Sequence, residues 1–314
     1  MLKSLISRVG LAAVTSISLI SCGDKEGSST TATENPQSSG DVSSEAVLVI
    51  SAIPDEKITD QKPKFDKVAA YLSSKLGVKA EFQFSKDYSD AIQKFKNGEA
   101  HLVWFGGLSG VQARMAVPGA EAIAQGVEDP KYKSYFIAHK DVAIEPGDEF
   151  PEAIKDLNFT FGSTGSTSGR LMPSYFILKN TGKLPGDWFT KGENFQASGG
   201  HVATANSVAD GTFQVGALSY KAYDKEVATN EKVKNNTKII WTTPYYADYN
   251  WTIHPDAKAA FGDSFFAKAQ DALVAAQEGD GVLEAINRSG IVPARNEEFD
   301  GIKDVAVKVG LIEE

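Results

Sequence analysis

From residue 46 onward, short apolar runs alternate with helical patterns, and this alternation constrains the fold more than any other feature of the sequence. The run at 46–53 has the apolar, β-branched composition of a strand, and 63–76 repeats apolar residues at helical spacing between Pro63 and Gly77. Strands that alternate with helices of about 10–15 residues form right-handed βαβ units. The pattern therefore predicts an α/β fold with a largely parallel sheet.

The same alternation continues to residue 241, and a mostly helical stretch begins at 256. Further strands are predicted at 78–85, 101–105, 120–126, 158–161, 213–218 and 237–241, and helices at 87–97, 108–117, 170–179, 202–209 and 256–277. The roughly 270 residues of this body exceed a comfortable single hydrophobic core, so we expect two α/β lobes. Open α/β sheets bind ligands at the carboxyl ends of their strands, so we expect a binding site in the loops that follow strands.

Residues 1–21 have the pattern of a secretory signal. Lys3 and Arg8 precede an apolar run at 14–20 that is too short to span a membrane as a helix, and Cys22 follows Leu-Ile-Ser. The arrangement resembles the bacterial lipoprotein signal, in which the cysteine is lipidated and becomes the mature N-terminus. We therefore expect a lipoprotein signal peptide at 1–21 and a membrane anchor on Cys22, with an ordinary signal peptide as the alternative.

Residues 22–45 consist mostly of small and polar residues and show no apolar periodicity. This composition is typical of a flexible tether. The sequence thus predicts a folded body that is held at a membrane outside the cytoplasm, in the periplasm or another extracytoplasmic space.

The charge balance and the scarcity of cysteine and histidine exclude several classes of function. The chain has 32 Lys and Arg against 41 Asp and Glu, a formal net charge of −9, and no basic run, so we expect no nucleic-acid partner. One cysteine excludes a disulfide framework and a cysteine-based metal site, and the four histidines are scattered. We therefore expect neither a metal nor a cofactor.

The loop at 162–169, with the sequence GSTGSTSG, is the sharpest functional signal. It follows a predicted strand and precedes the predicted helix 170–179, so backbone N–H groups and the positive end of the helix dipole point at one place. The hydroxyls of Ser166, Thr167 and Ser168 add donors without adding charge. The loop predicts a site for a small oxyanion built from neutral donors; an ordinary loop with Ser/Thr caps is the alternative.

Enzymatic interpretations of this loop have weaker support. The G-x-S-x-G pattern requires a central serine, where this chain has Thr167, and a P-loop requires Gly-Lys, where Gly169 is followed by Arg170. A secreted hydrolase that uses Ser166 or Ser168 with a histidine and an aspartate remains an alternative, because the order of triad residues along a chain is free.

Three further features lie at loops that follow strands. His201 comes after Ser198-Gly199-Gly200 at the start of a predicted helix, where it can donate to an anion from either ring nitrogen. An aromatic-rich segment at 242–251 contains Asp248, and the predicted strand 101–105 ends in Trp104 and Phe105 before two glycines. Taken one at a time, these features have structural alternatives: a helix-capping histidine, a solvated aspartate in a turn, and aromatic residues of the core, which the two aromatics alone favour.

These motifs, taken in order, resemble the phosphate/phosphite/phosphonate-binding proteins of ABC transporters (the PhnD type). The resemblance covers about residues 47–291 and is most specific in the STSG loop with Pro173 and the downstream His201. It implies the type II periplasmic binding protein fold, in which two lobes joined by a two-stranded hinge close over a ligand. Lobe one would comprise 46–138 and 243–314, and lobe two 139–242.

The resemblance also implies roles for individual residues and partners. Donors to the ligand would be Ser166, Thr167, Ser168 and His201, the acceptor would be Asp248, and the facing wall would include Ile53 and its loop, Trp104, Phe105 and Tyr246. Many members have aromatic-Gly-Pro-x-x-Tyr where this chain has FGGLSG, so this wall differs. The chain would be a non-enzymatic, monomeric solute receptor that works with an ABC permease.

The acidic residue narrows the expected ligand. A carboxylate beside an anion is repulsive unless the anion carries a proton, which favours hydrogen-phosphite, hydrogen-phosphonate or hydrogen-phosphate over sulfate. The predicted strand end at 216–221 offers no further carboxylate for an ammonium group, so a small substituent is expected. We expect phosphite first and methylphosphonate second; a receptor for phosphate or another tetrahedral oxyanion is the alternative.

Overall fold

The computed structural model describes residues 46–196 and 200–313 of the 314-residue chain. The expected signal peptide at 1–21, the expected lipidation site Cys22, the tether, and Ser198 and Gly199 lie outside the described residues. In the part that is described, no helix combines the length and the apolar character needed to cross a membrane.

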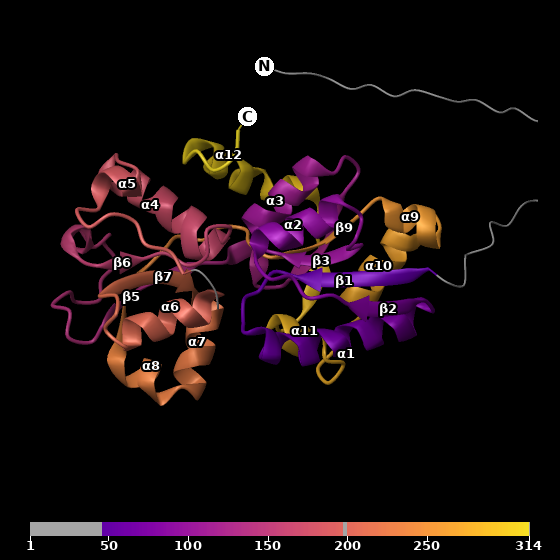
Figure 1. Cartoon of the computed structure of the whole chain (residues 1–314), viewed down its shortest axis with the longest axis horizontal. Helices are drawn as coiled ribbons and strands as arrows, with labels where there is room; N and C mark the ends of the chain where they lie inside the picture. The colour runs from indigo at the N-terminus through magenta and orange to yellow at the C-terminus, as the bar shows by residue number, and fades with distance from the viewer. Residues whose placement is uncertain (1–45, 197–199, 314) are drawn as a thin grey trace, which may run out of the picture. The chain divides into compact units, whose positions relative to one another are not determined.

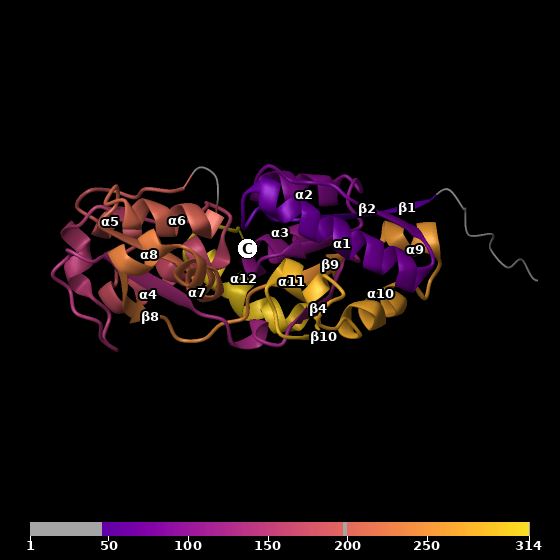
Figure 2. The same cartoon turned by 90° about the horizontal axis from the view of Figure 1, so that it is seen from below.

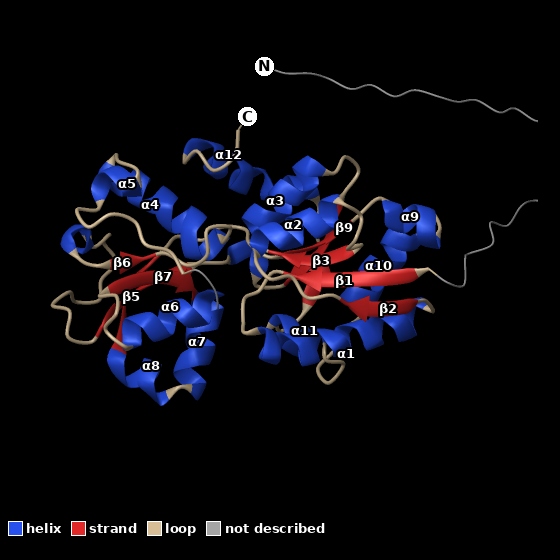
Figure 3. Cartoon of the chain, in the orientation of Figure 1, coloured by secondary structure: helices blue, strands red, loops and turns tan. Residues whose placement is uncertain are grey.

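Six strands form the first sheet, in the order β10-β4-β9-β3-β1-β2 (Figure 1). Helices cover both of its faces, with α2 and α3 on one side and α1, α10 and α11 on the other (Figure 3). The strands are Val47–Ala52 (β1), Lys79–Phe82 (β2), Leu102–Phe105 (β3), Glu121–Gly126 (β4), Asn250–Ile253 (β9) and Ile291–Pro293 (β10). The helices are Ile58–Leu76 (α1), Tyr88–Lys96 (α2), Gly107–Ala116 (α3), Asp256–Phe261 (α9), Phe265–Val274 (α10), Val282–Ile286 (α11) and Asp300–Lys308 (α12).

Four strands form the second sheet, in the order β6-β7-β5-β8. Helices α6, α7 and α8 pack on one face, and α4 and α5 lie on the other (Figure 3). The strands are Ser134–His139 (β5), Phe159–Thr160 (β6), Val215–Ser219 (β7) and Thr237–Thr242 (β8). The helices are Met172–Thr181 (α4), Pro185–Trp188 (α5), Gly200–Ala209 (α6), Tyr220–Thr229 (α7) and Glu231–Asn236 (α8).

The prediction of a largely parallel sheet is wrong, because both sheets are mixed. Strand β1 is parallel to β2 and β3, and β6 is parallel to β7. In the first sheet, β9 is antiparallel to both β3 and β4, and β10 is antiparallel to β4. In the second sheet, β5 is antiparallel to both β7 and β8. Strands β5, β8 and β9 adjoin the segments that connect the two sheets, and a strand that enters a sheet without a helical crossover need not be parallel to its neighbours.

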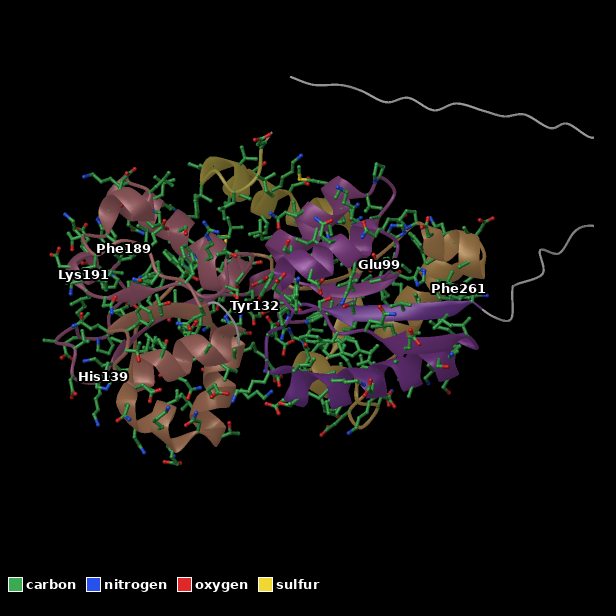
Figure 4. All side chains as sticks on the ribbon, in the orientation of Figure 1. Glu99, Tyr132, His139, Phe189, Lys191 and Phe261 are labelled. Carbon is green, nitrogen blue, oxygen red and sulfur yellow. The ribbon has the colours of Figure 1, made fainter. Side chains whose placement is uncertain are left out.

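Two segments, 127–133 and 243–249, connect the sheets and pair with each other; both can be followed in Figure 2. Tyr132 and Tyr246 exchange backbone hydrogen bonds of 2.8 and 3.0 Å. Figure 4 labels Tyr132 at this place, between the elements of the first and second sheets. The paired segments are the two-stranded hinge that the family resemblance implies.

The first lobe boundary differs from the predicted one. We expected lobe one to continue to residue 138, but β5 pairs with β7 and β8 of the second sheet. The apolar pattern of β5 indicates a strand without indicating which sheet it joins. We therefore place this boundary within 127–133, whereas the second expected boundary, after residue 242, coincides with the end of β8.

Candidate functional site

Three predicted site residues meet at Gly106, which follows β3. A Cβ placed on Gly106 would lie 3.2 Å from Thr167 Oγ1, 3.4 Å from Asp248 Oδ1 and 3.5 Å from Ile53 Cδ1. These side chains come from the second lobe, the hinge and the first lobe. Residues far apart in the sequence are thus brought together at the N-terminus of α3.

The N-terminus of α3 donates to two of these side chains. The Gly107 N–H donates to Asp248 Oδ1 at 2.9 Å, and the Leu108 N–H donates to Thr167 Oγ1 at 2.9 Å. The first N–H groups of a helix have no acceptor within the helix, so these contacts satisfy two of them.

The Ser/Thr loop enters α4 through a wide turn. Residues Thr167–Leu171 form a π-helical turn, and α4 itself begins at Met172, so the predicted helix start at 170 falls inside the turn. Ser166 Oγ accepts from the Gly169 N–H at 2.9 Å. The Ser166 hydroxyl therefore caps the turn, which leaves the amides of Thr167 and Ser168 as its uncapped first donors.

His201 is a buried, neutral donor at the start of α6, with 1% of its surface exposed. Its Nε2 lies 3.4 Å from Ser168 Oγ and 3.3 Å from Tyr249 Oη, and its Nδ1 accepts from the Ser219 N–H at 3.4 Å. Burial lowers the pKa of His201 to about 4, so the ring is neutral near pH 7. Because Nδ1 accepts a hydrogen bond, the ring proton is on Nε2. The sequence suggested that either ring nitrogen could donate, whereas in the structure only Nε2 can.

Asp248 is the acidic centre of this group and is fully buried. Its Oδ2 atom has no hydrogen-bond partner among the described residues. Burial raises the pKa of Asp248 from 3.8 to about 7; the charges of Asp129 and Asp55 act in the same direction, and the Gly107 N–H opposes them. Near neutral pH this carboxyl group can therefore either accept or donate a proton.

An aromatic wall lies beside these polar groups. Trp104 stacks on Tyr249 with ring centroids 5.4 Å apart and an interplanar angle of 19°. Both rings, with Tyr132 and His201, line a cavity of about 980 Å³. Exposed lysine and glutamate side chains form the rim of this cavity, so its volume includes the approach from solvent.

Phe105 does not belong to this wall, contrary to the role that the family resemblance implies. Successive side chains of a strand point to opposite faces, so Phe105 lies on the face of β3 opposite Trp104. It is fully buried and packs edge-to-face on Phe95 of α2, with centroids 5.6 Å apart. Phe105 is thus a core residue of the first lobe.

Tyr246 supports the Ser/Thr turn from the hinge. Its hydroxyl hydrogen-bonds Ser134 Oγ, and Ser134 Oγ in turn donates to the Ser168 carbonyl at 2.7 Å. Eight of the nine predicted pocket residues therefore lie in one connected group around Gly106, His201 and Trp104, with Phe105 as the exception. The group consists of Ile53, Trp104, Ser166, Thr167, Ser168, His201, Tyr246 and Asp248.

A buried ion pair lies beneath the wall, and no sequence pattern indicated it. Arg288 Nη2 donates to Asp129 Oδ1 at 2.8 Å, and both side chains are almost completely buried. The Arg288 guanidinium lies 4.7 Å from the Tyr249 ring centroid and 5.1 Å from that of Tyr132. The partners are 159 positions apart and follow no motif, so no local pattern could have paired them.

Two glycines allow the lobes to approach closely. A Cβ on Gly165, in the Ser/Thr loop, would lie 2.7 Å from Tyr88 Cβ on α2. A Cβ on Gly200 would lie 2.9 Å from the carbonyl oxygens of Pro54 and Asp55. Real Cβ atoms do not approach other atoms so closely, so a larger residue at either position would push the lobes apart.

Within 46–196 and 200–313, no cluster of three or more His, Cys, Asp or Glu side chains is arranged to hold a metal ion. The donors around Asp248 are neutral, and the nearby cation, Arg288, is already paired with Asp129. The geometry suits a small anion that brings or receives one proton.

Replacing Asp248 by Asn should make the protein's stability less dependent on pH. Between about pH 4 and 7 the native carboxyl group keeps a proton that the unfolded chain releases, so rising pH destabilises the wild type. The free energy of unfolding of the Asp248→Asn variant, minus that of the wild type, should therefore increase with pH across this window, by a total on the order of 4 kcal/mol. Urea unfolding of ligand-free protein at several pH values measures the difference; the exposed Asp304→Asn change is the control. A difference that stays constant with pH would contradict the raised pKa.

Comparisons with known proteins agree with this geometry. Residues 50–299 match the model of a family described as the periplasmic substrate-binding protein of a phosphonate ABC transporter. The chain is 32% identical over 272 residues to a probable ABC transporter phosphite-binding protein, PhnD1, from Prochlorococcus marinus strain MIT 9301; the alignment covers 85% of this chain and 91% of that protein. It is also 30% identical over 204 residues to the phosphonates-binding periplasmic protein of Escherichia coli K12, covering 64% of this chain and 58% of that one.

A solved structure is also similar. PhnD1 of Prochlorococcus marinus MIT 9301, in complex with methylphosphonate, superimposes with a TM-score of 0.79 at 31% sequence identity. The match covers 85% of this chain and 99% of that one. These relatives are binding proteins of ABC transporters and not enzymes, so the hydrolase alternative is not favoured. The chain belongs to the family of periplasmic substrate-binding proteins of phosphonate ABC transporters.

Proposed function

We propose that this solute-binding protein captures phosphite, with methylphosphonate as its second ligand, by closing its two lobes over the oxyanion. The observation that carries the proposal is the unpartnered, fully buried Oδ2 atom of Asp248, which lies in a group of neutral donors within the described part of the chain. An unpaired buried oxygen is unfavourable, and a ligand that supplies or receives a proton there would satisfy it.

The ligand oxygens would be held without a positively charged contact. We assign the donors as the uncapped amides and hydroxyls of Thr167 and Ser168 and the Nε2 proton of His201, while Ser166 holds the turn. Hydrogen bonds to a charged group contribute roughly 1.5–3 kcal/mol each. Five or six of them support binding in the micromolar to nanomolar range after the costs of association.

Asp248 would select among oxyanions through one shared proton. A phosphorus oxyanion can supply the proton that must lie between the carboxyl group and the ligand. Sulfate carries no proton near neutrality, so it would depend on the protonated form of Asp248, whose fraction decreases as pH rises through about 7. Discrimination against sulfate should therefore increase with pH.

The wall favours a small apolar substituent on phosphorus. Trp104 and Tyr249 present aromatic rings, which suit a hydrogen atom or a methyl group. An aminoalkyl group would need a free carboxylate, whereas Asp55 already accepts a hydrogen bond from Tyr88. The PhnD1 relative, described as phosphite-binding and solved with methylphosphonate, supports the same two ligands.

The protein works outside the cytoplasm with an ABC permease, as its family implies. We further propose that residues 1–21 are a lipoprotein signal peptide, that Cys22 is lipidated, and that the receptor acts as a monomer on the tether 22–45. The order of Lys3, Arg8, the apolar run and Cys22 supports the lipid anchor.

Titration calorimetry against a ligand panel tests the proposed specificity. We expect phosphite to bind most tightly and methylphosphonate next, with 2-aminoethylphosphonate and sulfate much weaker. The Asp248→Asn variant should bind phosphite at least about tenfold more weakly and discriminate less against sulfate, because it cannot share a proton. Tightest binding of 2-aminoethylphosphonate would overturn the order of ligands, and unchanged binding by the Asp248→Asn variant would remove Asp248 from the site.

Gly165→Ala should block closure while each lobe stays folded. The added Cβ would meet Tyr88 Cβ at 2.7 Å, whereas the matched control Gly147→Ala, also in the second lobe, meets nothing within 4 Å. We expect the Gly165→Ala variant to lose phosphite affinity by at least about tenfold and to show no ligand-induced decrease in its radius of gyration by small-angle X-ray scattering. Compaction equal to that of the wild type would show that closure does not use this contact.

Mass spectrometry of the mature protein from bacterial membranes tests the anchor. We expect an N-terminal peptide that begins at Cys22 and carries acyl chains, because several chains are needed for stable membrane attachment. Cys22→Ser should move the protein from the membrane to the soluble fraction. A mature N-terminus elsewhere, without acyl chains, would leave the ordinary signal peptide as the explanation.

A further inference from the structure

Glu56 lies in the loop between β1 and α1, at the rim of the cavity of about 980 Å³, and pairs with one lysine from each lobe. Its Oε2 atom accepts from Lys64 Nζ, which belongs to α1 of the first lobe. Its Oε1 atom accepts from Lys225 Nζ, on α7 of the second lobe, at 2.8 Å. The carboxylate of Glu56 is therefore shared between the two lobes at the entrance to the binding site.

The three side chains are partly exposed and carry their full charges near neutral pH. The exposed fraction of the side chain is 21% for Glu56, 31% for Lys64 and 41% for Lys225. Burial alone would raise the pKa of Glu56, but the hydrogen bonds and charges of Lys225 and Lys64 outweigh it and lower that pKa. An ion pair at this level of exposure is weak enough to break and still strong enough to change an equilibrium severalfold.

Opening of the lobes would separate Glu56 from Lys225 but not from Lys64. Glu56 and Lys64 belong to the same lobe, on the loop and the helix that follows it directly, so this pair can persist in the open form. Lys225 would return to water, where an ammonium group is strongly hydrated. Opening therefore leaves no buried charge without compensation, and the contact between the lobes can break and form again in each cycle.

A second lysine on α7 has a carboxylate partner in the hinge. Lys221 lies one helical turn before Lys225, and its Nζ lies 3.1 Å from Glu128 Oε1 in the connecting segment 127–133. A contact with the hinge lies near the axis of lobe rotation and changes least on opening. The pair of Glu56 and Lys225 joins opposite lobes instead, so it responds directly to closure.

We propose that the ion pair of Glu56 and Lys225 is an electrostatic latch: it slows the opening of the closed receptor and so sets how long a ligand is retained, without selecting among ligands. The inference deepens the proposed function and rests on it for the ligand that serves as the probe. Neither side chain belongs to the group around Asp248, so the latch should act alike on phosphite and methylphosphonate. Its contribution should decrease with ionic strength, because salt screens partly exposed charges.

Stopped-flow tryptophan fluorescence measures retention, since Trp104 lines the cavity. Lys225→Met should release phosphite about threefold faster than the wild type, with little change in the association rate and an unchanged ratio of phosphite to methylphosphonate affinity. Added sodium chloride should accelerate release from the wild type more than from this variant. Lys62→Met is the matched control and should release phosphite like the wild type, because it removes the same charge from an ion pair within α1.

Charge exchange separates the latch from general structural effects. Lys225→Glu places two carboxylates together and should release phosphite about tenfold faster, and Glu56→Lys in the same chain should recover most of this loss. In a double-mutant cycle, Glu56→Gln and Lys225→Met together should accelerate release little more than either change alone. Effects that multiply, or a release rate of the Lys225→Met variant equal to that of the wild type, would overturn the proposal.

The Leu108 amide reports closure without any ligand, because its acceptor, Thr167 Oγ1, belongs to the second lobe. In the ligand-free protein, NMR should show hydrogen exchange of this amide about threefold faster in the Lys225→Met variant than in the wild type. Failure of the wild type to bind phosphite and methylphosphonate would count against the proposed function alone. The exchange of the Leu108 amide would then decide the latch, and equal rates would overturn it.

Discussion

The buried ion pair between Asp129 and Arg288 fixes the geometry on which the site depends. Asp129 lies in the first connecting segment, and its backbone carbonyl accepts from the Asp248 N–H of the second at 3.1 Å. Arg288 holds the Asp129 carboxylate and places its guanidinium on the rings of Tyr249 and Tyr132. One cation thus joins the hinge to the aromatic wall. Removing one partner of such a buried pair leaves an uncompensated charge and costs about 3–5 kcal/mol.

The ion pair also explains why the oxyanion site itself can be neutral. Asp129 neutralises Arg288, so the groups around Asp248 consist of amides, hydroxyls and an uncharged imidazole. In such surroundings burial controls the protonation of Asp248, and the raised pKa gives the carboxyl group both proton states near neutrality. Selectivity for acids that can share a proton follows from this balance and requires no contact with a charged side chain.

Much of the fold and most of the candidate site could be predicted from local sequence patterns. The GSTGSTSG loop, the histidine at a helix start and the acidic residue among aromatics each carry their signal within a few residues, and the structure brings Thr167, His201 and Asp248 into one group. Pairing between distant residues leaves no such signal. The parallel-sheet prediction failed because β5, β8 and β9 adjoin the connecting segments and run antiparallel to their neighbours. Phe105 was misplaced because adjacent side chains of a strand point to opposite faces, so Trp104 and Phe105 cannot share one wall.

The division of the donor system between the lobes has a consequence for release. The Leu108–Thr167 hydrogen bond and the contact between Tyr249 Oη and His201 Nε2 both join groups from different parts of the chain. When the lobes separate, Thr167 and His201 lose partners that orient them, so the donors become less ordered as the ligand becomes exposed. The affinity of a neutral site that is assembled by closure therefore decreases in steps as the lobes separate. A site built around a fixed Lys or Arg would instead keep its attraction for the anion in the open form, because charge attracts without precise orientation.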